Sequence, residues 1–176
     1  MILNPFTIRD LRRLEGFIDV LRTVGMEFSI GPFIFSGLLL RESGATYGGG
    51  YFPKGSIIGW GDNHNGFGPF QLDKRFHTPF INSPQSAFLP AQARYAAGIL
   101  ASNRLRLMRL FPLMSEHEIL RATLASYNAL LSKVKFAIAS HKDVDSVTTG
   151  KDYSAWIIRK ADVLRLAKPS LFSISG

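Results

Sequence analysis

The chain has 176 residues, of which 46% are apolar, and this is enough for a substantial core in one domain. It contains no cysteine, which excludes a disulfide scaffold and a cysteine-based zinc site. The formal net charge of +8 favours an acidic partner, such as a nucleic acid, an anionic membrane or an anionic cell-wall polymer.

The first predicted element is an amphipathic helix. Apolar residues recur at helical spacing from Ile8 to Val24, and Gly25 is a plausible end. The segment from Thr7 to Asp10 resembles a capping box and would begin this helix.

A second, buried helix is predicted over residues 32–43. It begins with Pro32, a residue favoured in the first turn, and it is apolar on nearly all sides. Residues 44–58 contain three consecutive glycines and are predicted to form a loop. Residues 59–72 alternate glycine, aromatic and polar residues, which favours short strands or a hairpin.

The second half of the chain is predicted to be mostly helical. In chain order we expect a connection over residues 76–89, a helix from Pro90 to about Leu110, a helix opened by the capping box Ser115–Glu118, a helical stretch reaching about Ala139, a last helix opened by residues 149–152, and a tail over residues 168–176. The predicted fold class is therefore α+β, mainly α-helical, with one small antiparallel sheet.

Glu42 is the first candidate catalytic residue. It would lie in the last turn of the buried helix, where apolar neighbours and the negative end of the helix dipole both disfavour a charged carboxylate. Both effects raise the pKa, which suits a general acid near neutral pH. The alternative is a surface glutamate that reaches out to Arg41 or Arg75.

Asp62 and Asp73 are the second and third candidates, because they flank the possible hairpin. Two aspartates near a cleft can position and deprotonate a water, and in inverting glycosidases the two carboxyls stand roughly 6.5–9.5 Å apart. The alternative is structural: Asp62 is an ordinary turn residue, and Asp73 can pair with Lys74 or Arg75.

Other chemistries lack their usual motifs. The four histidines, His64, His77, His117 and His141, have no metal-ligand spacing. The chain also has no P-loop, no G-x-S-x-G motif and no dinucleotide-binding fingerprint. We therefore expect no metal and no cofactor. Aromatic residues crowd the glycine-rich region, where they could stack on sugar rings or belong to the core.

Together these segments resemble the goose-type lysozymes, within the wider lysozyme-like group that includes the soluble lytic transglycosylases. Four blocks carry the resemblance in family order: Arg41–Ser43 (R-E-S), Gly59–Arg75 (G-W-G-D to Q-L-D-K-R), Ser126–Ala129 (S-Y-N-A) and Thr148–Tyr153 (T-T-x-x-D-Y). The second block is long and specific. The resemblance covers roughly residues 30–161.

The resemblance implies a lysozyme-like fold with a small sheet beside a substrate groove. It implies that Glu42 is the catalytic acid and that Asp73 and Asp62 hold the attacking water, so that the anomeric carbon is inverted. The substrate would be the β-1,4 linkage of peptidoglycan between N-acetylmuramic acid and N-acetylglucosamine. The implied substrate-binding residues are Gln71, Tyr127, Asn128, Tyr153, Phe67 and Asn65.

The chain departs from the family pattern at three places. Pro69 and Phe70 replace Leu-Met, which should alter a wall of the groove, and Leu130 replaces a glycine, so that the backbone there would differ. The stretch between Ser43 and Gly59 is longer than in the relatives compared. We expect this glycine- and aromatic-rich stretch to be a mobile flap that closes over the sugar chain.

Several alternatives stay open at this stage. A lytic transglycosylase or a goose-type chitinase would use the same acid, and a non-catalytic cell-wall-binding module would need only the basic charge. The expected partner is peptidoglycan or a chitin-like polysaccharide, with a protein inhibitor left open, no nucleic acid, no transmembrane segment and a monomeric state. No signal peptide is visible, so we expect action on the cell wall after export by phage-type release, specialised secretion or a trimmed leader.

Overall fold

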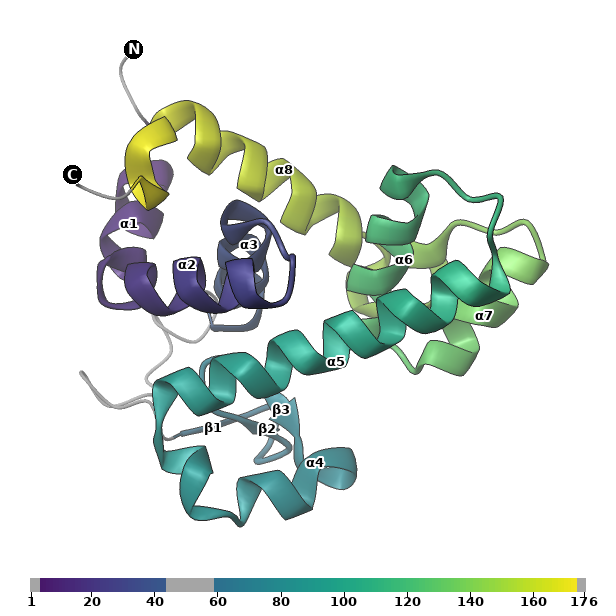
Figure 1. The fold of residues 1–176 in the computed structure, drawn as a ribbon, viewed down its shortest axis with the longest axis horizontal. Coiled ribbons are helices and arrows are strands. Elements are labelled where there is room, and N and C mark those ends of the chain that lie inside the picture. The colour runs from purple at the N-terminus through teal and green to yellow at the C-terminus, as the bar shows by residue number, and fades with distance from the viewer. Residues whose placement is uncertain (1–3, 44–58, 174–176) are drawn as a thin grey trace.

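The computed structural model describes residues 4–43 and 59–173, and Figure 1 shows a mainly helical architecture with one small sheet. The elongated helices α5 (Leu89–Leu110) and α8 (Tyr153–Ala167) connect its two ends. The helices α1 (Pro5–Leu14), α2 (Ile18–Glu27) and α3 (Pro32–Ser43) lie at one end. The predicted flap falls on residues 44–58 and lies outside the described residues.

The predicted single N-terminal helix was wrong, because a 3₁₀ turn at Glu15–Phe17 separates α1 from α2. This bend allows both Leu14 and Phe17 to reach the core. The cap is also different from the expected one, since the side chain of Asn4 accepts a hydrogen bond from the backbone nitrogen of Thr7 at 2.8 Å. Asn4 therefore begins α1.

Gly25 does not end a helix, since α2 continues to Glu27. Instead it allows a close approach: a Cβ at Gly25 would lie 2.8 Å from the carbonyl oxygen of Ile30. The chain returns here from α2 toward α3, and only a glycine leaves room for it.

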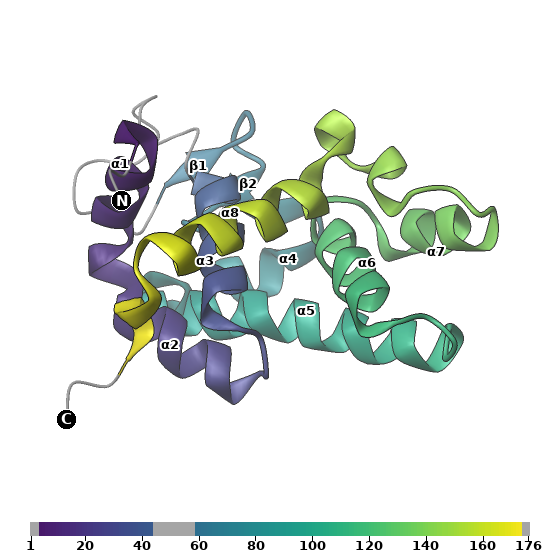
Figure 2. The ribbon, with the colours of Figure 1, turned by 90° about the horizontal axis from the view of Figure 1, so that it is seen from above.

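The predicted buried helix is confirmed, because α3 spans Pro32–Ser43. Figure 2 shows α8 crossing over α3, and the crossing is close at Gly37. A Cβ on Gly37 would lie 2.7 Å from the carbonyl oxygen of Ile157 in α8. The glycine lets the two helix backbones approach closely where they cross.

The predicted short strands are confirmed as a three-stranded antiparallel sheet in the order β1-β2-β3. The strands are β1 (Trp60–Gly61), β2 (Gly66–Phe67) and β3 (Leu72–Asp73), and Gly66 is paired with Asp73. In Figure 1 the sheet lies between α5 and α4 (Lys74–Ile81). The predicted connection over residues 76–89 was therefore partly wrong, because α4 occupies its first half.

A kink explains why α4 tolerates a proline. His77 has non-helical dihedral angles (φ −123°, ψ 17°), and Pro79 follows two residues later. Because the helical geometry is already interrupted at His77, Pro79 does not have to fit an undisturbed helix. A 3₁₀ turn at Pro84–Ala87 then leads into α5.

The predicted helix from Pro90 to Leu110 is confirmed by α5. The capping box is also confirmed, because Ser115 and Glu118 exchange hydrogen bonds at the start of α6 (Glu116–Asn128). The next helix, α7 (Leu131–Ala139), ends where the sequence predicted.

The predicted N-cap of the last helix was wrong. Residues Thr149–Lys151 form a separate 3₁₀ turn, and α8 begins only at Tyr153. Residues expected in the tail form another 3₁₀ turn, Pro169–Phe172, in which Leu171 is buried and Phe172 packs edge-on against Phe33 at 4.9 Å. These residues therefore belong to the core.

The core has two parts. The larger one lies between α2, α3, α5, α8 and the sheet, and the smaller one lies between the end of α5, α6 and α7. No helix among residues 4–43 and 59–173 is both long and apolar enough to cross a membrane.

Candidate active site

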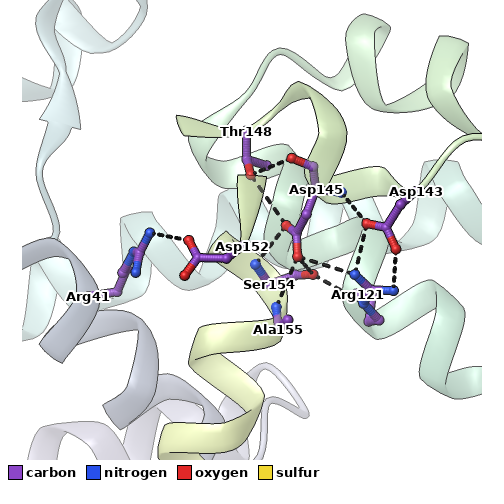
Figure 3. Close-up of polar contacts among 8 residues, drawn as sticks. All are labelled: Arg41, Arg121, Asp143, Asp145, Thr148, Asp152, Ser154 and Ala155. Atoms are coloured by element: carbon purple, nitrogen blue, oxygen red, sulfur yellow. Dashed lines mark hydrogen bonds and ion pairs between the residues drawn. The ribbon is translucent and has the colours of Figure 1, made fainter. Parts of the chain in front are cut away.

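The end of α3 and the start of α8 meet through two consecutive pairs of residues. The phenolic hydroxyl of Tyr153 donates a hydrogen bond to Oε1 of Glu42. The neighbouring guanidinium of Arg41 lies 2.8 Å from the carboxylate of Asp152, as Figure 3 shows. Glu42 therefore does not reach out to Arg75, and its carboxyl group is held between helices.

The environment of Glu42 changes its acidity. Burial of the carboxyl group raises its pKa from 4.5 to about 7, although the hydrogen bond from Tyr153 and the charge of Arg41 act in the opposite direction. The largest cause is thus the loss of water around the charged form. At neutral pH a large fraction of Glu42 is protonated, as a general acid requires.

Tyr127 is the second phenol beside Glu42. Its hydroxyl donates to the carbonyl oxygen of Phe70 at 2.8 Å, which ties α6 to the loop between β2 and β3. Burial and then the charge of Glu42 raise the pKa of Tyr127 well above 10, and the same two causes raise the pKa of Tyr153. Both phenols therefore remain protonated hydrogen-bond donors.

A groove with a volume of about 510 Å³ lies beside this cluster, between β3, α4, α5 and the end of α6. Four of the candidate residues named from the sequence line it, namely Gln71, Asp73, Tyr127 and Asn128. Tyr127 links the groove to Glu42, because it lines the groove and the charge of Glu42 contributes to its raised pKa.

Asp73 has a structural role and an ionised carboxylate. It is the N-cap of α4, and its Oδ1 accepts hydrogen bonds at 2.9 Å from both the backbone nitrogen and Nε of Arg75. These interactions with Arg75 lower the pKa of Asp73. Its carboxylate is therefore charged at neutral pH and can accept a proton or a hydrogen bond from water.

Asp62 lies in the exposed turn between β1 and β2. Its backbone has φ of 46°, in the left-handed region that aspartate tolerates in turns. The pKa of Arg75 is raised, chiefly by Asp73 and to a smaller extent by Asp62. The charge of Asp62 thus acts on the guanidinium group that Asp73 binds.

The side chain of Gln71 packs against two glycines of the sheet beside the groove. Its Nε2 donates to the carbonyl oxygen of Gly68 at 2.9 Å. A Cβ on Gly61 would lie 2.1 Å from Oε1 of Gln71, and one on Gly66 would lie 2.4 Å from it. The two glycines of the predicted motif therefore make room for this side chain.

The surroundings differ among three predicted substrate-binding residues, Asn128, Phe67 and Asn65. Asn128 is exposed, and its Oδ1 accepts a hydrogen bond from the backbone nitrogen of Thr149 at 2.8 Å. Phe67 is buried and contacts the ring of Trp60 edge-on at 5.1 Å. Asn65 belongs to the β1–β2 turn and is not among the residues that line the groove.

The structure shows the surroundings of Phe70 and Leu130, two of the departures from the family pattern. Phe70 is fully buried and stacks on Phe35 at 5.1 Å, so the expectation that it alters a groove wall was wrong. Leu130 does line the groove, and its φ of −60° is ordinary for a residue with a side chain. The backbone at Leu130 therefore does not need a glycine.

Sequence reasoning did not name His77, Asp145 or Asp152 as site residues. His77 lines the groove, its Nδ1 lies 3.2 Å from the hydroxyl of Tyr95, and burial lowers its pKa against the opposing effect of Asp73. Its place four residues after Asp73 was the signal in the sequence that could have pointed to it.

Among residues 4–43 and 59–173, no cluster of histidine and acidic side chains could hold a metal ion.

Comparisons with known proteins agree with this geometry. A profile of the family described as Lysozyme g matches residues 4–166. Lysozyme G of Dromaius novaehollandiae is 31% identical over 153 residues, which cover 87% of this chain and 68% of the relative. Lysozyme g of Gallus gallus is 30% identical over 159 residues, which cover 89% of this chain and 67% of the relative. Lysozyme g of Cyprinus carpio is 28% identical over 158 residues, which cover 89% of this chain and 76% of the relative. The chain belongs to the lysozyme g family and is a glycoside hydrolase of the goose type.

Proposed function

We propose that the chain is a muramidase that hydrolyses the β-1,4 bond between N-acetylmuramic acid and N-acetylglucosamine in peptidoglycan. Glu42 is the general acid that protonates the leaving oxygen. Asp73 and Asp62 hold the water that attacks the opposite face of the sugar, and the anomeric carbon is inverted.

The observation that carries this proposal is the environment of Glu42. A carboxyl group with a pKa of about 7 can donate a proton to the glycosidic oxygen at neutral pH. The hydrogen bond from Tyr153 leaves one oxygen of the carboxyl group, Oε2, without a contact to that phenol. That oxygen is the one that would face the leaving group.

The proposed water site rests on Asp73 and its neighbours. Asp73 lines the groove as an ionised carboxylate, while a large fraction of Glu42 is protonated near pH 7. Two carboxyls with pKa values pushed in opposite directions are the arrangement that acid and base roles require. The net charge of +8 also suits an anionic wall polymer outside the cytoplasm.

The substrate is tested by comparing rates on purified peptidoglycan and on chitin oligomers, with Glu42→Gln as the control. Cleavage of peptidoglycan that is lost in Glu42→Gln supports the proposal. Faster cleavage of chitin oligomers would instead make the chain a chitinase.

Proton NMR of the first products distinguishes inversion from retention at the anomeric carbon, because an inverting enzyme releases the α-anomer from a β-linked substrate.

One observation favours a second candidate, a lytic transglycosylase. Asp73 already caps α4 and pairs with Arg75, and Asp62 lies in an exposed turn, so both have structural roles. A transglycosylase needs the acid but no activated water, because the sugar's own hydroxyl closes a 1,6-anhydro ring. A product without a reducing end would support this candidate.

A further inference from the structure

The first turn of α8 is capped from outside its own helix. Asp152 occupies the N-cap position, but its side chain makes no capping hydrogen bond and instead pairs with Arg41 at 2.8 Å. Asp145 replaces it: Oδ1 accepts from the backbone nitrogen of Ser154 at 2.8 Å, and Oδ2 accepts from that of Ala155 at 3.1 Å. Without Asp145 these two donors would lack partners at the helix end.

Asp145 is itself held tightly. It is 2% exposed, and it also accepts hydrogen bonds from the hydroxyl of Ser154 at 2.8 Å and from the guanidinium of Arg121 at 3.2 Å. Arg121 in turn binds both oxygens of Asp143, at 2.8 and 2.9 Å. Figure 3 shows this cluster, in which the carboxylate of Asp145 lies between Arg121 of α6 and the start of α8.

We propose that Asp145, held by Arg121, is a positioning residue of the active site: it fixes the first turn of α8 so that the hydroxyl of Tyr153 meets Glu42. This inference rests on the proposed role of Glu42 as the acid. Neither Asp145 nor Arg121 is among the residues that line the groove.

The geometry gives this cluster a direct route to Glu42. Tyr153 immediately precedes Ser154, whose backbone nitrogen and hydroxyl both bind Asp145. The first turn of a helix without caps frays readily, because its backbone donors lack partners within the helix. A displacement of this turn would move the phenol of Tyr153 away from Glu42.

Arg121 connects the same turn to the second phenol. It lies on α6, six residues before Tyr127, and its Nε also donates to the hydroxyl of Ser154 at 3.3 Å. The cluster therefore joins the two helices that bring tyrosines to Glu42. Within residues 4–43 and 59–173, the titratable groups that face Glu42 are Arg41 from α3, Tyr127 from α6 and Tyr153 from α8.

Asp145 can perform this role because it remains charged. Burial alone would raise its pKa, but the hydrogen bonds from Ser154, Ala155 and Arg121 outweigh that effect and lower it. A charged acceptor makes stronger hydrogen bonds to backbone N–H groups than a neutral one. An asparagine of the same shape would bind the turn more weakly.

The test is the pKa of Glu42, measured by carboxyl ¹³C NMR and assigned with Glu42→Gln. Tyr153→Phe removes the hydrogen bond that lowers this pKa, so the pKa should rise. Asp145→Asn should raise it in the same direction, by about 0.5 to 1. In the double variant the pKa should equal that of Tyr153→Phe alone, because Asp145 affects Glu42 through Tyr153, the phenol that donates to Glu42, whereas Tyr127 donates to Phe70.

A matched control is Asp162→Asn, which removes an exposed ion pair with Arg165 from a later turn of the same helix. It should leave the pKa of Glu42 unchanged. An unchanged pKa in Asp145→Asn, or effects of Asp145→Asn and Tyr153→Phe that add fully, would overturn the proposal. A merely structural Asp145 would lower the melting temperature without moving this titration.

A second variant decides the matter if Asp145→Asn does not fold. Arg121→Gln leaves the backbone hydrogen bonds of Asp145 in place and removes its charged partner, together with the ion pair to Asp143 and the hydrogen bond to Ser154. A smaller rise in the pKa of Glu42 is therefore expected. No rise in a folded Arg121→Gln protein would overturn the proposal. The NMR readout needs no turnover, so it distinguishes failure of the positioning role from an active Glu42→Gln enzyme, which would refute the proposed acid.

Discussion

Tyr153 donates its phenolic hydrogen bond to Glu42 across a separation of 111 residues in the chain. The contact joins the last turn of α3 to the first turn of α8, and the adjacent pair of Arg41 and Asp152 joins the same two turns. The carboxyl group is therefore oriented by one helix while it is carried by another. This arrangement has consequences for pH dependence, stability and turnover.

The first prediction concerns the pH dependence of activity. Turnover requires protonated Glu42, so kcat/KM should fall as the pH rises through about 7. The measurement is the initial rate of peptidoglycan cleavage between pH 4 and 9 at constant ionic strength. A basic limb near the ordinary glutamate value of 4.5 would contradict the assigned acid.

The second prediction concerns the stability of Glu42→Gln. The folded pKa is about 7 against an ordinary value of 4.5, so the unfolded chain loses its proton first, and wild-type stability falls as the pH rises from about 4.5 to 7. Glutamine removes this penalty. The variant should be more stable than wild type at pH 8, by up to about 3 kcal/mol, with a smaller difference at pH 4.

Denaturant unfolding of both proteins at pH 4 and pH 8 measures this difference. The retained fold of Glu42→Gln would also show that its loss of turnover is chemical. Equal stability of the two proteins at pH 8 would mean that Glu42 ionises in the folded state without penalty.

The third prediction ranks the two aspartates. Asp73→Asn should lower kcat by about 100-fold, and Asp62→Asn should lower it less, because Asp73 is fixed by the cap of α4 and by Arg75 while Asp62 lies in an exposed turn. Asparagine also caps helices well, so Asp73→Asn should fold normally.

Steady-state kinetics with circular dichroism as the folding check test this ranking. The reverse order would mean that Asp62 is the main holder of the water. Near wild-type rates in both variants would leave the aspartates with structural roles only and would favour the transglycosylase.

The fourth prediction concerns Gln71. In Gly61→Ala the new Cβ would lie 2.1 Å from Oε1 of Gln71, so the end of that side chain must move away from its hydrogen bond with Gly68, and activity and stability should both fall, the latter by about 1 kcal/mol. In the double variant Gly61→Ala/Gln71→Ala the clash is absent. Its stability should return toward that of Gln71→Ala, which thermal unfolding measures, whereas purely additive losses would speak against the clash.

Sequence reasoning identified the features that depend on local patterns. The limits of α3 follow from Pro32 and the apolar run after it, and the start of α6 follows from the capping box of Ser115 and Glu118. The short strands around Gly61 and Gly66 follow from the alternation of glycine and aromatic residues. The family motifs then predicted that Gln71 and Tyr127 would share a groove.

Features that depend on distant partners were not visible in the sequence. Asp152 has the position of an ordinary N-cap, but its carboxylate forms an ion pair with Arg41 of another helix instead of capping α8. Asp145 caps α8 instead, from the 3₁₀ turn Val144–Val147, and its partner Arg121 lies on α6. No spacing rule connects these residues, because three-dimensional packing alone brings them together.

The most direct test of the central claim is digestion of purified peptidoglycan in H₂¹⁸O, followed by mass spectrometry of the soluble products. The account predicts reducing muropeptides that carry one ¹⁸O at the new reducing end, and no products with Glu42→Gln. Products with a 1,6-anhydro end and no ¹⁸O would contradict the role of Asp73 and Asp62 in holding water. Labelled products from Glu42→Gln at the wild-type rate would contradict the role of Glu42 as the acid.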